Sequence, residues 1–309
     1  MNAAPWYMSP GALEFAAEKS LPPLLRGIVD SFLELGFAVV PASVDAQVCD
    51  RAVSAFNRFA SLNDDKFGPF RDAQGHYPRL VNFHLAIDEL MPLFTQNRAL
   101  ALTDFLFQAE TVLYTSLFYE RGSAQDVHRD TPYFTTRPEY RYFGVWVALE
   151  DADAGNGPLI VVPGGHLLPE LPRAQIAREM WPSPEDTPDE SQELWEKYQA
   201  RVHEQMKRLG LTVREVHVKK GDTIIWHPHL PHGGGAINDL SRTRFSLVMH
   251  VTPPGTPVYH QKAFFNPSMP LPETAPWSYK SGGGRRFAAH ATVSIGHQVD
   301  YAPREFRRL

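Results

Sequence analysis

Two kinds of hydrophobic pattern divide the chain. Up to about residue 110, apolar positions recur at helical spacing, which predicts helices over residues 24–35 and 44–62 around a short buried strand at 37–40. Gly36 is expected to end the first helix, and Ser43 is the expected N-cap of the second. No chemical motif stands out in this region, so we interpret it as scaffold.

From about residue 111 onward, short β-rich runs follow one another, separated by glycine- and proline-containing turns. The predicted strands are residues 112–119, 140–149, 159–162, 213–218, 222–226 and 243–251. Short strands that recur without alternating long helices favour an antiparallel sandwich or barrel over a parallel α/β sheet. The pattern therefore predicts a mainly β fold with flanking helices.

One insertion and one tail depart from the strand pattern. Residues 167–210 are broken by prolines and acidic at first, and then predict a helix over 191–209. This insertion is either a lid over a site or a surface helix that packs on the sheet. The tail, residues 263–309, is rich in glycine and proline in its first half and is interpreted as an extended wrap or a flexible rim. Because no repeat or linker is visible, we predict a single domain over 1–309, with a helical flank of about 1–110, a β core of about 111–255 and an extension of about 256–309.

Composition narrows the class of protein. The 309 residues are 43% hydrophobic and carry 30 basic against 35 acidic side chains, a net charge of −5, which argues against disorder and against a nucleic-acid-binding surface. No apolar run is long enough to span a membrane, and residues 1–19 lack the basic start of a secretory signal. The single cysteine, Cys49, fits a reducing compartment, so we expect a cytoplasmic protein. Oligomeric state is not readable. With 13 histidines and one cysteine, any metal would be bound by imidazole and carboxylate groups.

A candidate metal site begins at Val127-His128-Arg129-Asp130. On an extended chain, residues two apart project to the same face, so His128 and Asp130 would offer an imidazole and a carboxylate side by side. The best third ligand is His232, on a glycine-rich turn after the predicted strand 222–226. Two histidines and one carboxylate form the ligand set of non-haem Fe(II) oxygenases. The spacing alone is weak, because most isolated His-x-Asp sequences are unrelated to metals.

A second feature makes the site more specific. In the predicted strand 243–251, Arg244 and Ser246 lie on one face, and both faces are largely apolar. A buried guanidinium is costly unless it meets an anion, which is either an internal Asp or Glu or a bound carboxylate or phosphate. The hydroxyl of Ser246 is expected to add a hydrogen bond to a bound anion. Together with an iron triad, the bound carboxylate is favoured, because 2-oxoglutarate needs a metal at its keto-acid end and a basic anchor at its distal carboxylate.

These motifs resemble those of one known family. His128-x-Asp130, Val161-Val162-Pro163-Gly164-Gly165-His166, Gly221-Asp222-Thr223-Ile224-Ile225-Trp226-His227-Pro228, His232 and Arg244 follow the order and approximate spacing of the phytanoyl-CoA dioxygenase family, over roughly residues 20–255. The resemblance implies a double-stranded β-helix, a cupin-like jelly roll. It also implies Fe(II), 2-oxoglutarate and O2 as cofactor and cosubstrates, with His128, Asp130 and His232 as metal ligands and Arg244 as the 2-oxoglutarate anchor. Arg242 is the rival anchor, because Arg244 lies one position further from the distal histidine than in many relatives.

The implied activity is hydroxylation of an unactivated C–H bond of a small-molecule metabolite or natural-product intermediate, with release of succinate and CO2. Halogenating relatives have Gly or Ala at the carboxylate position, so Asp130 favours hydroxylation or another oxidative outcome over chlorination. Two alternatives remain: a cupin-like metalloenzyme that does not use 2-oxoglutarate, and a non-catalytic jelly-roll binding protein. The substrate itself cannot be read from the sequence.

Several other residues have weaker expected roles, each with a structural alternative. Gln125 is expected to hydrogen-bond 2-oxoglutarate, or to be a solvated loop residue. Tyr133, Phe134 and Trp146 are candidates for the substrate side of the pocket or for the core, and His84 is a further candidate for contact with substrate.

His227 and His229 form an H-x-H-x-x-H pattern with His232, which suggests an all-histidine site. The triad is preferred, because Pro228 and Pro231 indicate an irregular loop.

Overall fold

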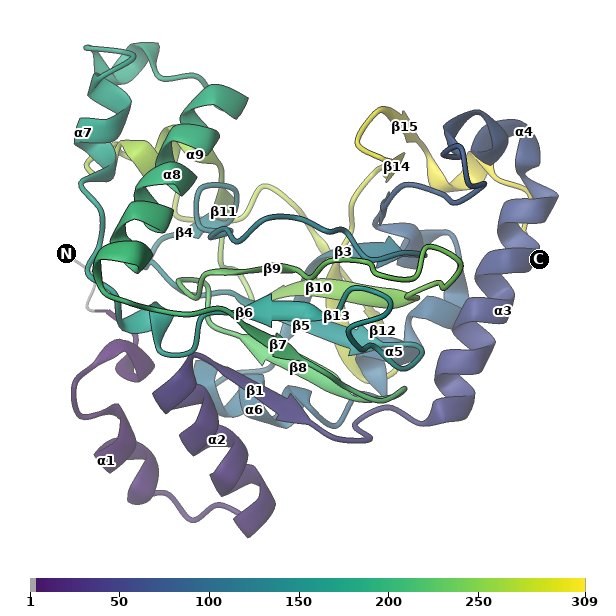
Figure 1. Ribbon diagram of the computed structural model, residues 1–309, viewed down its shortest axis with the longest axis horizontal. Coiled ribbons are helices and arrows are strands. Elements are labelled where there is room, and N and C mark those ends of the chain that lie inside the picture. The colour runs from purple at the N-terminus through teal and green to yellow at the C-terminus, as the bar shows by residue number, and fades with distance from the viewer. Residues whose placement is uncertain (1–3, 309) are drawn as a thin grey trace.

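Two sheets face each other in the computed structural model, which describes residues 4–308 (Figure 1). The ends of the predicted domain, residues 1–3 and 309, lie outside the described residues. The helices are α1 Ala12–Ala17, α2 Pro23–Leu35, α3 Ala46–Leu62, α4 Asp64–Phe67, α5 Pro92–Thr95, α6 Leu100–Phe107, α7 Arg173–Arg178, α8 Gln192–Arg208 and α9 Gln261–Phe265. The strands are β1 Phe37–Val40, β2 Leu80–Val81, β3 Val112–Tyr119, β4 Thr135–Thr136, β5 Phe143–Ala148, β6 Leu159–Val161, β7 Arg214–Val216, β8 Thr223–Trp226, β9 His232–Gly234, β10 Ser246–Thr252, β11 Val258–Tyr259, β12 Tyr279–Gly282, β13 Arg285–Ala288, β14 Val293–Ile295 and β15 Val299–Tyr301.

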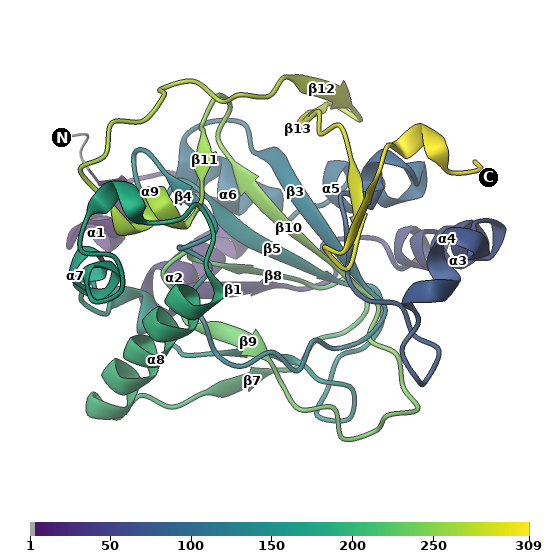
Figure 2. The same ribbon diagram turned by 90° about the horizontal axis from the view of Figure 1, so that it is seen from above.

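The larger sheet runs in the order β1-β8-β5-β10-β3-β2-β14-β15, with the β12–β13 hairpin attached to β3. The smaller sheet has the order β7-β6-β9. Figure 2 shows β8, β5, β10 and β3 in one layer and β7 and β9 in the other. The pairings between the central strands are antiparallel. This arrangement confirms the predicted jelly roll with flanking helices.

Alternation along the central strands divides the core in two. On β5, Val145 and Val147 face the helices α2, α3 and α6, whereas Trp146 and Ala148 face the smaller sheet. The inner face of β10 carries polar groups, because Ser246 and His250 alternate there with the outward apolar residues of the strand. The polar side chains that matter for function therefore lie between the two sheets.

Most predicted elements are confirmed. The strands at 37–40 and 112–119 have the predicted bounds, and the other predicted strands and helices differ by one to three residues at their ends. The Ser43 cap is wrong: Asp45 caps α3 by accepting a hydrogen bond from the Gln47 N–H. The Ser43 hydroxyl instead lies buried against the start of β8, where it bonds Thr223 Oγ1 at 2.6 Å.

The insertion and the tail are both packed against the β core. Helices α7, α8 and α9 share a buried apolar cluster with Val127 and Val162 of the core. The tail forms β12 to β15, and β14 pairs with β2 at the edge of the larger sheet. Of the two interpretations of the tail, the extended wrap is therefore the one that the strand pairing supports. No helix among residues 4–308 is long and apolar enough to cross a bilayer.

Candidate metal centre

Strand pairing brings the three predicted ligands together. His128 and His232 form an antiparallel bridge, in which the backbone N–H of each residue donates to the carbonyl of the other at 2.8 and 3.0 Å. His232 was expected on a turn but is the first residue of β9. Asp130 lies two residues beyond His128, on the same side of the extended segment.

The side chains of the triad converge on one point. The Nε2 atoms of His128 and His232 lie 3.3 and 3.4 Å from the two carboxylate oxygens of Asp130. All three potential ligand atoms fall within 4.8 Å of one another, and His128 and His232 are buried. This is the only such cluster of His, Cys, Asp and Glu side chains in the described part of the chain.

The backbone fixes the orientation of both imidazoles. The Nδ1 atom of His128 lies 2.8 Å from the carbonyl of Asp126, and that of His232 lies 3.0 Å from the carbonyl of Leu230. Because a carbonyl only accepts, each Nδ1 donates to it, and each Nε2 is the ring nitrogen turned toward Asp130. Metal-binding histidines are held in the same way, with one ring nitrogen for the metal and the other on an outer partner.

Asp130 is surrounded by imidazoles. Its burial alone would raise its pKa, but His232, His128 and a third histidine, His250, hold the pKa of Asp130 well below its usual range. The Nε2 of His250 lies 3.3 Å from Asp130 Oδ2, and its ring stacks on Phe134 with the centroids 3.9 Å apart. The carboxylate is therefore ionised at neutral pH, as a metal ligand must be.

Arg244 is the buried cation that the sequence predicted. Its side chain is only 3% exposed, and its one hydrogen bond among the described residues runs from Nη1 to the carbonyl of Gly157 at 2.7 Å. Within residues 4–308, its Nε has no hydrogen-bond partner, and neither does the hydroxyl of Ser246, which is fully buried. Burial lowers the pKa of Arg244 to about 10, so the guanidinium stays charged at neutral pH. The group lies over the ring of Trp146, 5.3 Å from its centroid.

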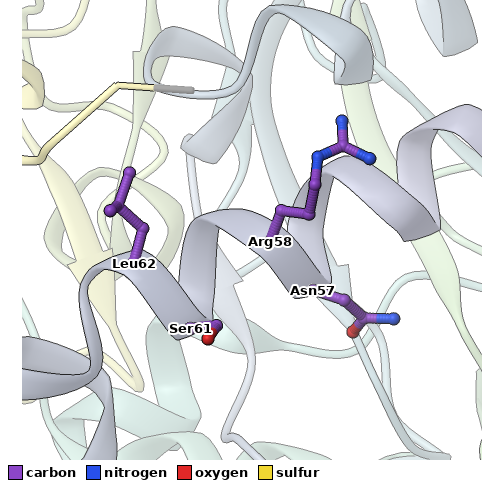
Figure 3. A pocket seen from close by; sticks show the side chains of 4 residues that line it. All are labelled: Asn57, Arg58, Ser61 and Leu62. Atoms are coloured by element: carbon purple, nitrogen blue, oxygen red, sulfur yellow. The ribbon is translucent and has the colours of Figure 1, made fainter.

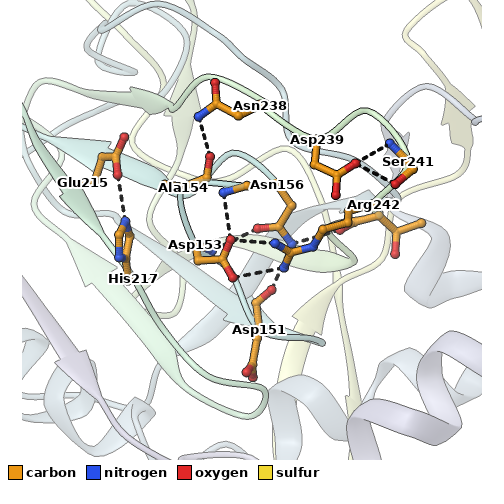
Figure 4. A network of polar contacts seen from close by, with 12 residues as sticks. Asp151, Asp153, Ala154, Asn156, Glu215, His217, Asn238, Asp239, Ser241 and Arg242 are labelled. Carbon is orange, nitrogen blue, oxygen red and sulfur yellow. Dashed lines mark hydrogen bonds and ion pairs between the residues drawn. The ribbon is translucent and has the colours of Figure 1, made fainter.

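The rival anchor, Arg242, is already paired (Figure 4). Its two terminal nitrogens donate to the two carboxylate oxygens of Asp153 at 2.7 and 3.1 Å. The pair is more than a third exposed and belongs to a surface network on the loops between the strands. Arg244, with donors still unsatisfied, is thus the better anchor for an anion.

The triad and Arg244 line one cavity of about 860 Å³ between the sheets. The cavity lining includes four of the residues predicted to contact 2-oxoglutarate or substrate: Gln125, Tyr133, Phe134 and Trp146. The lining also includes residues from the insertion and from the extension that follows residue 255: Glu190, Gln192, Trp195, His260, His290 and His297.

A second, shallow depression lies on the outer face of α3 (Figure 3). It is lined by Asn57, Arg58, Ser61 and Leu62, all of them exposed and all from one helix. Because these side chains are open to solvent, the depression is not an enclosed site for a ligand.

Comparison with known proteins assigns the family. Residues 32–244 match the phytanoyl-CoA dioxygenase family. The chain belongs to this family. It is 32% identical over 116 residues to the peroxisomal phytanoyl-CoA dioxygenase of Bos taurus, and 31% identical over 120 residues to a probable phytanoyl-CoA dioxygenase of Caenorhabditis elegans. These matches cover 38% and 37% of the chain but only 30% and 32% of the relatives, so the chain spans about a third of their length.

Solved structures with the same fold support this assignment at the level of architecture. The epimerase SnoN, in complex with Fe3+, α-ketoglutarate and nogalamycin RO, is 21% identical, with a TM-score of 0.58 over 87% of this chain and 99% of that one. The carbocyclase SnoK from nogalamycin biosynthesis is 14% identical, with a TM-score of 0.58 over 88% and 98% of the two chains. The protein EctD from S. alaskensis, with 2-oxoglutarate and 5-hydroxyectoine, is 16% identical, with a TM-score of 0.56 over 83% and 85%.

The residues of this phytanoyl-CoA dioxygenase family member fit the cofactors of the family. The triad supplies two imidazole Nε2 atoms and one ionised carboxylate, and three positions of an octahedral ion would remain open. The unpartnered donors of Arg244 and Ser246 fit a bound carboxylate. Fe(II) and 2-oxoglutarate are therefore the cofactors assigned to this site.

Three histidines considered for the site from the sequence lie outside it in the structure: His84, His227 and His229. His84 is buried outside the cavity lining, with its Nδ1 2.7 Å from the hydroxyl of Ser116. His227 and His229 point into the protein away from the triad, because the irregular loop at Pro228 turns their side chains toward His166 and the backbone of Leu168. Burial holds the pKa of both well below the usual range, so they are neutral core histidines.

Sequence reasoning missed His250 and the lining residues of the insertion and the extension. His250 alternates with Ser246 on β10 and with Arg244 just before that strand, so its inward direction could have been read from the pattern. The lining residues of the insertion and the extension carry no such signal, because the placement of these segments is set only by tertiary packing.

Proposed function

We propose that the protein is an Fe(II)- and 2-oxoglutarate-dependent oxygenase that hydroxylates an unactivated C–H bond of a small molecule. The observation that carries the proposal is the pairing of two features in one cavity. A His-Asp-His cluster lies in the same cavity as a buried arginine whose Nε has no hydrogen-bond partner among the described residues. A metal ion alone would explain the first feature and not the second.

Each residue has a separate role in this proposal. His128, Asp130 and His232 would hold the iron, with the imidazole orientation fixed by the carbonyls of Asp126 and Leu230. Arg244 would bind the distal carboxylate of 2-oxoglutarate by charge-assisted hydrogen bonds. Bound iron and 2-oxoglutarate supply the oxidising chemistry, in which O2, 2-oxoglutarate and substrate give hydroxylated product, succinate and CO2.

The rest of the chain would orient the substrate and exclude water. Gln125, Tyr133, Phe134 and Trp146 line the cavity, and we propose that the first assists 2-oxoglutarate while the aromatic groups bound the substrate side. The neighbours described as an epimerase and a carbocyclase have the same fold, so the nature of the product is a direct test of hydroxylation. We also propose a single domain in a reducing, cytoplasmic compartment, in keeping with a buried free thiol at Cys49.

The test is an anaerobic titration of the apo-protein with Fe(II) and then 2-oxoglutarate. A weak visible charge-transfer band should develop, and admission of air should convert 2-oxoglutarate to succinate. A His128→Ala variant that folds normally should show neither signal. The absence of both the band and succinate in the wild-type protein would refute the proposal.

The two alternatives predict different results in the same experiment. A cupin-like metalloenzyme would bind iron but show no response to 2-oxoglutarate. A jelly-roll binding protein without catalysis would function equally well with His128→Ala. The unsatisfied donors of Arg244 favour the 2-oxoglutarate enzyme over both.

A further inference from the structure

The segment with two of the three proposed ligands forms the edge of the smaller sheet. His128 pairs with β9 through its own N–H and C=O groups. Along an extended chain the backbone groups alternate in direction, so the neighbouring groups of Val127 and Arg129 point away from β9. If such an edge is not covered, its outward N–H and C=O groups stay unpaired and the position of the segment is poorly fixed.

Helix α8 of the insertion supplies partners for that edge. The Arg129 N–H donates to Oε1 of Gln199 at 3.0 Å, and Nε2 of the same Gln199 donates to the Arg129 carbonyl at 3.0 Å. One turn further on, Nε2 of His203 donates to the Val127 carbonyl at 2.6 Å. The amide of Gln199 thus takes the place of a neighbouring strand, and it does so at the residue between His128 and Asp130.

The side of α8 that carries Gln199 and His203 also reaches the cavity. Residues 195, 199 and 203 are spaced by four and therefore lie on one side of the helix. Trp195 lines the cavity, with its ring centroid 5.9 Å from that of His128 and 6.3 Å from that of Tyr133. From Trp195 at the cavity to Gln199 and His203, these residues contact the ligand segment that pairs with β9.

The helix is itself held firmly in place. Its buried residues Leu194, Tyr198 and Val202 share an apolar cluster with Val127 and with α7 and α9. Its N-terminus is capped by Ser191, whose side chain accepts a hydrogen bond from the Leu194 N–H. A helix anchored in this way can hold the ligand segment in one position, whereas a mobile lid could not.

We propose that Gln199 is a positioning residue for the metal centre. Together with His203 it makes α8 a brace that fixes the backbone between His128 and Asp130, so the insertion is a structural part of the metal site. The inference rests on the proposed function, since it takes the triad as the metal site. Coupling between sites is reciprocal, so metal binding should in turn stabilise α8.

The chain offers a matched control on the same helix. Gln205 is 4% exposed, against 5% for Gln199, and its Nε2 donates to a backbone carbonyl at 2.8 Å. Its partner, however, is Pro169 within the insertion and not the ligand segment. Replacing either glutamine by methionine keeps the volume and removes one buried amide.

The experiment is a titration of apo-protein with Co(II), in which the visible d–d absorption of the bound ion reports binding. Gln199→Met should raise the Co(II) dissociation constant by about tenfold, the lower end of the cost of losing an outer partner of a ligand, because Gln199 holds the backbone between two ligands and not a ligand itself. Gln205→Met should change the constant by less than about threefold. His203→Gln, which alters a half-buried side chain, should give a smaller loss in the same direction. In the wild-type protein, Co(II) should also slow hydrogen exchange of the α8 amides.

Three outcomes distinguish failure of the α8 brace from failure of the metal site. Unchanged Co(II) affinity in folded Gln199→Met, or equal losses in the Gln199 and Gln205 variants, would overturn the brace. Unchanged exchange in α8 on Co(II) binding to the wild-type protein would overturn it even if the variants do not fold. A His128→Ala protein that binds Co(II) normally would instead overturn the metal site of the proposed function.

Discussion

Arg244 is the residue on which the assignment of 2-oxoglutarate depends most. Replacing it with methionine keeps much of the volume next to Trp146 and removes the charge. A carboxylate bound there would lose its partner in a buried site, at a cost of about 3–5 kcal/mol. At about 1.4 kcal/mol per tenfold, the dissociation constant of 2-oxoglutarate should rise by roughly a hundred- to several-thousand-fold.

The same substitution should leave the protein folded and its metal site intact. The free guanidinium makes only one hydrogen bond, to Gly157, so its loss should change the free energy of unfolding by no more than about 1 kcal/mol. The affinity for Fe(II) should not change measurably, because Arg244 is outside the ligand cluster. The assay is an anaerobic titration of the Fe(II)-loaded protein with 2-oxoglutarate, together with chemical unfolding of the apo-protein.

Arg242→Met is the matched control. Arg242 belongs to a partly exposed ion pair with Asp153, so its replacement should cost at most about 1 kcal/mol of stability and leave 2-oxoglutarate binding unchanged. The reasoning is refuted if Arg244→Met binds 2-oxoglutarate like the wild type, or if Arg242→Met is the variant that loses it. Equal loss of iron and 2-oxoglutarate in Arg244→Met would show that the arginine supports the fold.

Three further predictions follow from single side chains. Ser246→Ala should raise the 2-oxoglutarate dissociation constant by about five- to tenfold in a titration, because one hydrogen bond is worth about 1 kcal/mol. Chemical unfolding should show no loss of stability in the apo-protein, because the hydroxyl has no partner among the described residues. Gly144→Ala should lower the free energy of unfolding by about 1–3 kcal/mol, because the new Cβ would lie 2.0 Å from the ring of Trp226. Gly27→Ala, which has open space on α2, should raise the free energy of unfolding by up to about 1 kcal/mol. Similar effects of the two substitutions on stability would contradict the packing argument. Burial lowers the pKa of His166 from 6.5 to about 4, so the unfolded chain binds more protons and the stability present above pH 6.5 is lost as pH falls toward 4. Urea unfolding should show that His166→Asn avoids about 2 kcal/mol of the loss between pH 7 and 5; an identical pH profile would exclude this role.

Local patterning was sufficient for much of the fold. Strands such as β3 could be placed because a run of β-branched and aromatic residues is bounded by turn residues on both sides. The cap of α3 could not, because Ser43 and Asp45 are both suitable caps and only the packing of β8 decides which side chain is free. The strand at His232 was missed for a similar reason, since three glycines predict a turn unless a neighbouring strand pairs with them.

Some features of the site also follow from the sequence, whereas others depend on the tertiary structure. The sequence by itself determined the chemistry: His128 and Asp130 share a face because the chain is extended, and Arg244 must be buried because its neighbours along the strand are apolar. Only the tertiary structure decided that Arg242 is paired and Arg244 is not, that His250 lies beside Asp130, and that His84 lies outside the cavity. It also decided that the insertion packs against the ligand segment through Gln199. The physical reason is that backbone direction fixes which face a side chain takes, whereas the partner on that face comes from a segment far along the chain, and its position depends on how the whole core packs.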